Sequence, residues 1–182
     1  MSRRWKFVDS RALYFVSYAV VQWVDVFVRN EYKQELIASL KYCQEHKGLD
    51  LYGWCIMPSH VHLIIGSEIM PLEHILRDMK RHTSEKLHEL IENHPQESRK
   101  KWMLSMFEQA GINNSNNRRW QFWQQNNKPI LLRNQEMTMR TLNYIHNNPV
   151  ISGFVEEPCH WIYSSALDYS GRQGFLNIRL LE

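Results

Sequence analysis

The chain has 182 residues, of which 43% are hydrophobic and 23% charged, a composition typical of globular proteins. Its net charge of +3 allows a nucleic-acid partner without requiring one, and no apolar run is long enough to span a membrane. Its three cysteines, Cys43, Cys55 and Cys159, form no Cys-x-x-Cys pair, which argues against a disulfide framework and predicts small buried residues in a reducing compartment. We therefore expect one cytoplasmic domain over residues 1–182, with a C-terminal tail from about residue 153.

The first half of the chain predicts the order strand, helix, strand, strand, helix over residues 13–28, 31–46, 49–57, 60–66 and from Pro71 onward. Aromatic and β-branched residues dominate the run 13–28, and these residue types favour strands. This run is expected to be one long strand, or a strand that bends or pairs with itself near Gln22. Asn30 is the predicted cap of the first helix, and Gly48 is its predicted C-terminal stop. The second helix is predicted to bury an apolar stripe of Leu72, Leu76, Met79, Thr83, Leu87 and Leu90.

The second half predicts a helical piece over residues 98–110 that ends at Gly111, a polar loop over 113–117 and a strand over 118–125. A last helix is expected to begin after Asn134 and to stop just before Pro149. Hairpin-linked strands that alternate with helices indicate an α+β fold, in which an antiparallel sheet packs against helices.

The sequence His60-Val61-His62 is the first candidate for chemistry. Alternate residues of a strand share a face, so both imidazoles are expected to point away from the apolar side of the strand. Two imidazoles side by side can bind a metal ion as a pair. Such a pair taken alone is more often two polar residues on a solvated strand face, so its interpretation depends on what lies beside it.

Tyr144 and Asn148 form the second candidate. Residues four apart on a helix share a face, so the phenol and the amide are expected to be presented together. The residues Thr138, Leu142 and Ile145 form the predicted packing stripe behind them. A capping asparagine beside a half-buried tyrosine is the alternative interpretation of this pair.

The two candidates together suit the cleavage of a phosphodiester. A tyrosine can attack phosphorus and retain the energy of the broken bond in a covalent intermediate. A divalent ion neutralises the charge that develops on the phosphate. Free tyrosine has a pKa of about 10, so Tyr144 needs a nearby cation or base in order to ionise. The amide oxygen of Asn148 could be a third ligand beside His60 and His62.

These motifs resemble those of the single-tyrosine HUH transposases, a family named after two histidines that flank a bulky hydrophobic residue. The family's Met-Pro-Asn-His-Val-His-Leu run is similar to Met57-Pro58-Ser59-His60-Val61-His62-Leu63, and its tyrosine helix is similar to the segment from Tyr144 to Val150. Two further segments, Phe122-Trp123-Gln124 and Trp161 to Ser165, are similar to the branch associated with repetitive extragenic palindromes. The resemblance extends from about residue 13 to residue 169.

The resemblance implies a ferredoxin- or RRM-like antiparallel sheet and a homodimer. It implies that His60, His62 and a polar residue of the tyrosine helix, here Asn148, bind Mg²⁺ or Mn²⁺. It also implies that Tyr144 attacks single-stranded DNA near a hairpin, which leaves a 5′-phosphotyrosine and a free 3′-OH. Two imidazoles suit Mn²⁺ better than Mg²⁺, which prefers oxygen ligands. Ser59 stands where asparagine is commoner in the family, and Asn148 stands where some relatives have glutamine.

Two clusters are candidates for contacts with DNA. Arg77, Lys80 and Arg81 on the long helix could bind backbone phosphates. Arg118, Arg119 and Trp120 combine charge with an aromatic face that could stack on a base. Solvated helix faces and ordinary loop charges explain each cluster about as well.

The leading hypothesis is therefore a DNA transposase that cuts and rejoins single strands. One alternative is a domesticated protein that binds a DNA hairpin and no longer moves DNA, although all the groups required for cleavage are present. A zinc hydrolase built on the two histidines is a weaker alternative, because it leaves Tyr144 without a role and lacks a nearby third His, Cys or carboxylate.

Overall fold

The computed structural model of the chain describes residues 7, 9, 12–112, 119–125 and 129–181. Its strands are β1 (Tyr14–Ala19), β2 (Asp50–Ile56), β3 (His60–Gly66) and β4 (Ile130–Leu131). Its α-helices are α1 (Asn30–Lys47), α2 (Leu72–Asn93), α3 (Lys100–Ile112), α4 (Gln135–Ile151) and α5 (Ala166–Tyr169). Three short 3₁₀ segments complete the structure, η1 (Val21–Trp23), η2 (Val26–Val28) and η3 (Pro158–His160).

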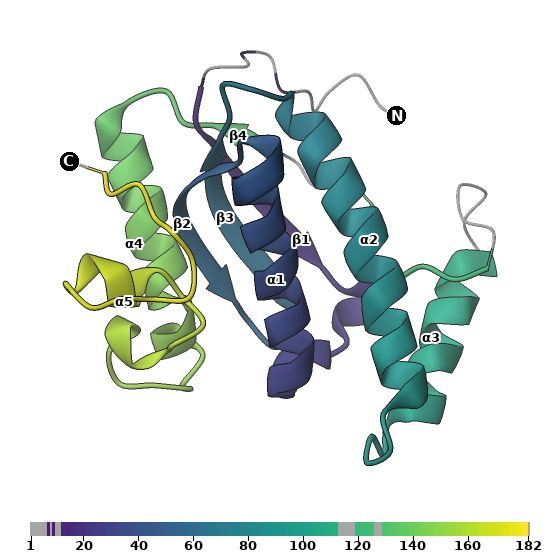
Figure 1. Cartoon of the computed structure of the whole chain (residues 1–182). Helices are drawn as coiled ribbons and strands as arrows, with labels where there is room; N and C mark the ends of the chain where they lie inside the picture. Colours follow the sequence, from purple (N-terminus) through teal and green to yellow (C-terminus); the bar gives the residue numbers. More distant parts are fainter. Residues whose placement is uncertain (1–6, 8, 10–11, 113–118, 126–128, 182) are drawn as a thin grey trace.

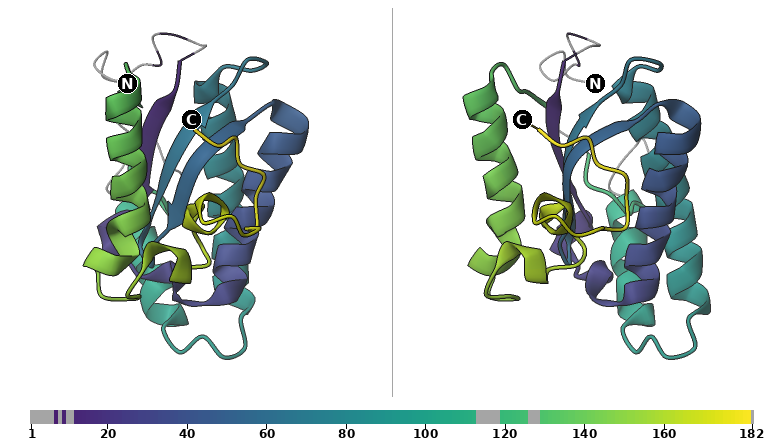
Figure 2. Two further views of the ribbon diagram at one scale, coloured as in Figure 1. Left: turned by 90° about the vertical axis from the view of Figure 1, so that its left-hand side faces the viewer. Right: turned by 60° about the vertical axis from the view of Figure 1, so that its left-hand side comes forward.

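The four strands form one antiparallel sheet in the order β2-β3-β1-β4. Helices α1 and α2 cover one face of the sheet, and α4 covers the other (Figures 1 and 2). The chain order β1-α1-β2-β3-α2-β4 with this strand order is that of a ferredoxin-like fold, into which α3 is inserted before β4. The predicted α+β class with an antiparallel sheet is therefore confirmed.

The two faces of β3 contact different helices, and the two histidines lie on the face toward α4. Val61, Leu63 and Ile65 lie in the larger core cluster, together with apolar residues of α1 and α2. Ile64 lies in the smaller cluster, together with apolar residues of α4. Because strand residues alternate between faces, His60 and His62 point with Ile64 toward α4, on the side expected from the sequence.

The run 13–28 is not one long strand, because β1 ends at Ala19, and the chain bends near Gln22, which was the alternative. Gln22 and Trp23 have φ angles of 53° and 59°, a left-handed conformation that an extended strand does not contain. The chain therefore turns through η1 and η2 on its way to α1. The polar residue Gln22 lies in this turn, whereas the valines and aromatic residues on both sides of it favour a strand.

The strand predicted over 118–125 is also wrong for the described residues 119–125. Only Trp123 pairs there, in an isolated bridge with Val20. The fourth strand is β4, which pairs with the start of β1. With two residues, β4 is too short to show an alternating pattern in the sequence.

Two predicted helix boundaries are confirmed. Gly48 ends α1 in a left-handed conformation with a φ of 69°, and the Asn134 side chain caps α4 by accepting from the Met137 N–H at 2.8 Å. Asn30, by contrast, is the first residue of α1 and not its cap. On α2 the predicted stripe is buried except at Leu90, which is exposed, whereas Ile91 is buried.

Gly111 and Pro149 were predicted to mark the ends of their helices, but both lie within them. Gly111 is required by packing, because a Cβ at this position would come within 2.5 Å of the Trp120 backbone. Pro149 lies in the last turn of α4, which continues to Ile151. Proline has no backbone N–H, so position 149 cannot donate a helical hydrogen bond, and α4 ends two residues later.

The segment after residue 153 has more structure than the predicted tail. Its residues Tyr163 and Ser165 pair with the free edge of β2, where the Ile56 N–H donates to the Tyr163 carbonyl and the Ser165 N–H donates to the Trp54 carbonyl, both at 2.9 Å. Covering an edge strand in this way protects it from pairing with other chains. No helix among the described residues is both long and apolar enough to cross a membrane.

A buried carboxylate joins the start of α3 to the entry of α1. Glu97 accepts from Arg29 at 2.8 Å and from Arg99 at 3.0 Å, and its side chain is almost fully buried. Burial alone would raise the pKa of Glu97, but the hydrogen bonds from Arg99 and Arg29 outweigh it and lower the pKa to about 2.

We expect Glu97→Gln to lower the free energy of unfolding at pH 7 by about 3 kcal/mol, because two arginines lose their buried partner. For a domain of this size, such a loss lowers the melting temperature by roughly 6–12 °C. Since the folded-state pKa is depressed, the stabilisation is present above the ordinary glutamate pKa and disappears as the pH falls toward about 2. Melting curves at pH 7 and pH 3 test this, and the difference between wild type and variant should shrink at pH 3. Glu89→Gln, which removes the exposed ion pair with Lys86, is the control and should change little at either pH.

Candidate active site

The structure brings His60, His62 and Tyr144 together between the sheet and α4. The ring centroids of His60 and His62 are 4.7 Å apart, and those of His62 and Tyr144 are 5.4 Å apart. His62 is 4% exposed, whereas Tyr144 is 50% exposed. An exposed phenol therefore lies directly beside a buried imidazole.

His62 has no hydrogen-bond partner among the residues that the structure describes. Both of its ring nitrogens are buried and unpartnered, and Phe15 of β1 stacks on the ring at 5.6 Å. Burial, followed by the neighbouring His60, lowers the pKa of His62 to about 3, so the ring is neutral at pH 7. An unpartnered buried polar group costs about 1–3 kcal/mol and calls for an explanation. A neutral imidazole with a free lone pair fits a metal ligand.

Ser59 orients His60. The Ser59 Oγ lies 3.2 Å from His60 Nδ1, which leaves Nε2 as the nitrogen available to a ligand. Partners of this kind hold the tautomer and the ring angle of metal-binding histidines. Burial lowers the pKa of His60, and the charge of Asp25 partly opposes this effect. The sequence showed Ser59 only as a departure from the family's commoner asparagine, and the structure adds its contact with His60.

Asn148 lies one helical turn beyond Tyr144 on α4 and is half-buried. Its Nδ2 donates to the Tyr144 carbonyl at 3.2 Å, which leaves Oδ1 as the acceptor that a metal would use. Behind this face, Thr138, Leu142 and Ile145 are buried as predicted. The assignment of Asn148 as the third ligand stays a prediction.

His146 belongs to the site in a way that sequence analysis missed. It lies between Tyr144 and Asn148 but faces the protein interior, where its Nε2 is 2.8 Å from Ser165 Oγ. Ser165 Oγ in turn accepts from the Trp54 N–H of β2 at 2.9 Å. Burial lowers the pKa of His146 to about 4. This buried chain of hydrogen bonds fastens α4, and Tyr144 with it, to the sheet. The Ser164-Ser165 pair was visible in the sequence, but its partner far along the chain was not.

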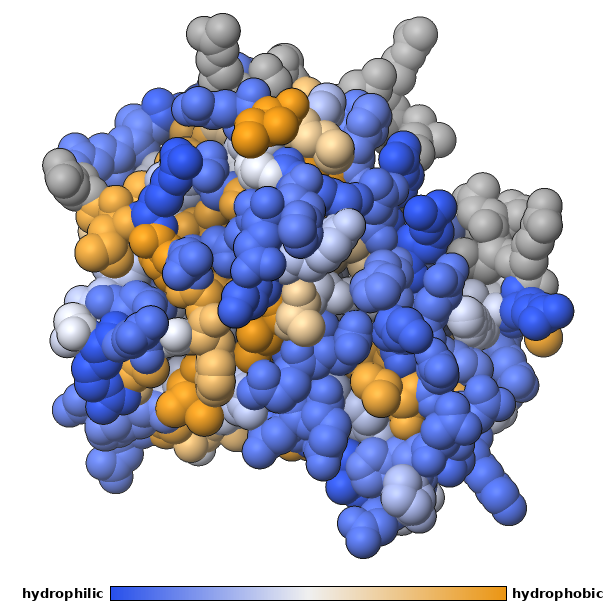
Figure 3. Space-filling view, viewed as in Figure 1, coloured by the Kyte–Doolittle hydropathy of each residue, from blue (hydrophilic) through white to orange (hydrophobic). Residues whose placement is uncertain are grey.

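The predicted DNA contacts on α2 lie on the face of the sheet opposite Tyr144 (Figure 1). Arg77 is exposed and pairs with Asp78 at 3.0 Å, and Arg81 is exposed. Lys80 instead donates to the Gln124 carbonyl at 3.0 Å, and burial lowers its pKa to about 8. The surface over α2 and α3 is largely hydrophilic (Figure 3). Contact between these residues and DNA stays a prediction.

The second predicted cluster is described only in part, because Arg118 lies outside the described residues. Trp120 packs its ring against His88 at 4.3 Å, and Arg119 is exposed. Both border a pocket of about 580 Å³ lined by His88, Glu92, Glu108, Ile112, Arg119 and Trp120. Its two carboxylates oppose the binding of phosphate at this point.

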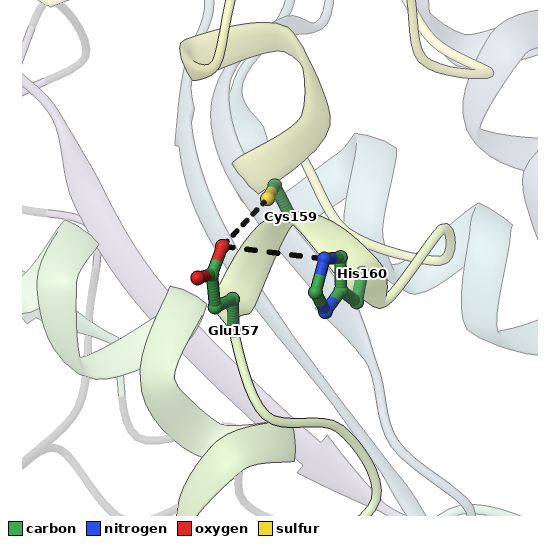
Figure 4. Close-up of side chains that lie close together, drawn as sticks. All are labelled: Glu157, Cys159 and His160. Atoms are coloured by element: carbon green, nitrogen blue, oxygen red, sulfur yellow. Dashed lines mark hydrogen bonds and ion pairs between the residues drawn. The ribbon is translucent and has the colours of Figure 1, made fainter.

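A second group of possible metal ligands follows α4 in the chain. Glu157, Cys159 and His160 converge around η3, and their ligand atoms all lie within 4.8 Å of one another (Figure 4). Glu157 Oε2 is 3.8 Å from Cys159 Sγ and 4.0 Å from His160 Nε2. The cysteine prediction is confirmed for Cys43 and Cys55, which are buried free thiols, but it is wrong for Cys159, which is partly exposed.

Comparison with known proteins identifies the family to which the chain belongs. A family model described as "Transposase IS200 like" matches residues 19–111, a span that contains both histidines but ends before Tyr144. The structure of a REP-associated tyrosine transposase bound to a REP hairpin is similar, with a TM-score of 0.64 and 16% identity over 98% of this chain and 92% of that chain. A Deinococcus radiodurans R1 protein assigned as a transposase matches with a TM-score of 0.41 and 18% identity over 78% of this chain and 94% of that chain. No curated protein matches the sequence significantly. Because the family model matches just over half of the chain, this protein belongs to the IS200-like transposase family.

Proposed function

We propose that this transposase cuts and rejoins single-stranded DNA through a covalent 5′-phosphotyrosine at Tyr144. His60, His62 and Asn148 are the proposed ligands of a divalent ion, Mn²⁺ or Mg²⁺. The observation that carries the proposal is the buried His62, whose two ring nitrogens find no partner in the described part of the chain and whose ring lies against that of an exposed tyrosine. Neither capping nor core packing explains that combination.

Each side chain has a defined part in the proposed reaction. The Tyr144 Oη forms a bond to phosphorus while the bond from phosphorus to the 3′ oxygen breaks. The phenolic proton leaves to solvent, and the released 3′ oxygen takes up a proton from solvent. A bound divalent ion supplies positive charge to the phosphate oxygens. His146 and Ser165 hold α4 in place, so that Tyr144 stays beside His62.

The proposed substrate is a single strand that carries a hairpin near the cut. Its support is the fold shared with a REP-associated tyrosine transposase that binds a REP hairpin. Tyr144 contacts His62 of its own chain, so one subunit holds the groups required for one cut. In the homodimer that we also propose, two such sites would process the two ends of an element.

We expect the protein with Mn²⁺ to cut a synthetic single strand that carries a stable hairpin with randomised flanks. A denaturing gel should show protein bound covalently to one fragment, together with a fragment that ends in a 3′-OH. EDTA should abolish the adduct, because neutral imidazoles cannot neutralise the phosphate by themselves.

The same gel separates this proposal from its alternatives. Hairpin binding without any cut, with either Mn²⁺ or Mg²⁺, would instead support a domesticated DNA-binding protein. Cutting without a covalent adduct would support a hydrolase and contradict the role of Tyr144.

A further inference from the structure

Trp23 is an exposed aromatic residue at the edge of the histidine pair. Its side chain is 58% exposed, and its ring centroid lies 5.4 Å from that of His60, at an angle of 75°. Tryptophan is one of the most costly residues to leave in water. Its exposure beside a candidate metal ligand leaves its ring available for contact with a bound substrate.

The backbone that carries Trp23 is strained. A positive φ is a genuine outlier for a bulky residue, and Trp23 and its neighbour Gln22 both adopt one. Hydrogen bonds hold the turn in place, since the Val20 N–H donates to the Ser59 carbonyl at 2.9 Å and the Phe27 N–H donates to the Pro58 carbonyl at 2.7 Å. The turn that displays Trp23 is thus tied to the residues that immediately precede His60. Strain that the surrounding structure maintains is a feature of functional sites.

The order of the rings across the site gives Trp23 a position relative to the reaction. Successive contacts join Trp23 to His60, His60 to His62, and His62 to Tyr144. Trp23 and Tyr144 are therefore at opposite ends of this row. In an in-line displacement, the attacking and leaving oxygens lie on opposite sides of phosphorus. If a phosphate is held at the histidines between these two ends, its leaving 3′ oxygen would lie on the side away from Tyr144, which is the side of Trp23.

We propose that Trp23 stacks on the base of the nucleotide immediately 5′ of the scissile phosphate. This inference rests on the proposed function and names the part of the substrate that this side of the site binds. Every base has a π-face, so the contact tolerates different sequences. It would hold the released 3′-OH end close to the phosphotyrosine, where that end can attack again during rejoining.

The test begins with the cut site obtained from the randomised hairpin strand. That strand is synthesised intact, with an abasic site 5′ of the cut, and with an abasic site 3′ of the cut. The variant Trp23→Gly removes the ring and suits the left-handed backbone, so it should fold at least as well as wild type. Trp102→Ala removes a similarly exposed tryptophan, 52% exposed on α3, and serves as the control.

On the intact strand, Trp23→Gly should slow adduct formation at subsaturating DNA by between about fivefold and about a hundredfold. Loss of the base 5′ of the cut should slow wild type similarly and leave Trp23→Gly with no further defect. Loss of the base 3′ of the cut should slow both proteins by the same factor. Trp102→Ala should match wild type on all three strands.

Two results would overturn the assignment while leaving the proposed function intact. One is equal rates for wild type and Trp23→Gly on the intact strand. The other is a Trp23→Gly defect that persists when the 5′ base is missing. If wild type forms no adduct on any hairpin strand, the proposed function is wrong, and the assignment of Trp23 is wrong with it.

Discussion

Tyr144→Phe should abolish the covalent protein–DNA adduct, with a loss on the order of a thousandfold or more in its rate of formation. The change removes one oxygen from a side chain that is 50% exposed, so the fold should be unaffected. Hairpin binding should stay within about twofold of wild type, because the phenyl ring still packs against His62 and Phe15. Adduct yield on a denaturing gel and hairpin affinity by fluorescence anisotropy measure the two effects separately.

Tyr42→Phe is the matched control for this prediction. Tyr42 is 54% exposed on α1, which covers the opposite face of the sheet from α4. Its hydroxyl should make no difference to the adduct. An adduct that persists in Tyr144→Phe at the wild-type rate would show that another residue is the nucleophile.

His62→Leu should raise the stability of the metal-free protein and at the same time abolish cleavage. Both ring nitrogens of His62 are buried and find no partner within residues 12–112, 119–125 and 129–181, and leucine removes them at similar volume. We expect a gain of about 1–2 kcal/mol in EDTA, which corresponds to a rise of roughly 2–8 °C in melting temperature. Wild type should gain stability when Mn²⁺ is added, because a ligand that binds only the folded state stabilises it. The variant should gain little or none.

His146→Leu provides the comparison, because His146 is equally buried but hydrogen-bonded to Ser165. Removing that bond should destabilise the protein by about 1–2 kcal/mol in EDTA, and the Mn²⁺-induced rise should be retained. Opposite signs for the two substitutions would identify His62 as a residue kept for binding at the expense of stability. If His62→Leu melts below wild type in EDTA, the imidazole of His62 makes favourable interactions within the protein, and its burial no longer supports a metal site.

Much of the fold could be predicted from local patterns. The bounds of β3, the left-handed Gly48 and the Asn134 cap all follow from residues close in sequence, and all three are found in the structure. The strand predictions were wrong for residues 21–28 and for the described residues 119–125, because their backbone partners lie far away in the chain. Val21, for example, donates to the Phe122 carbonyl at 2.8 Å. Periodicity carries no information about such a bond.

The sequence by itself determined the α+β class, the placing of His60 and His62 on one face of a strand, and the shared helix face of Tyr144 and Asn148. These depend on the two-residue repeat of a strand and the 3.6-residue repeat of a helix, which are properties of the backbone. Only the tertiary structure decided that the tyrosine face lies against the histidine face, and that Ser165 holds it there through His146. Tertiary packing also left His62 without a partner and turned Trp23 outward beside His60. Burial and exposure of this kind depend on which distant segments meet, and no local pattern encodes that.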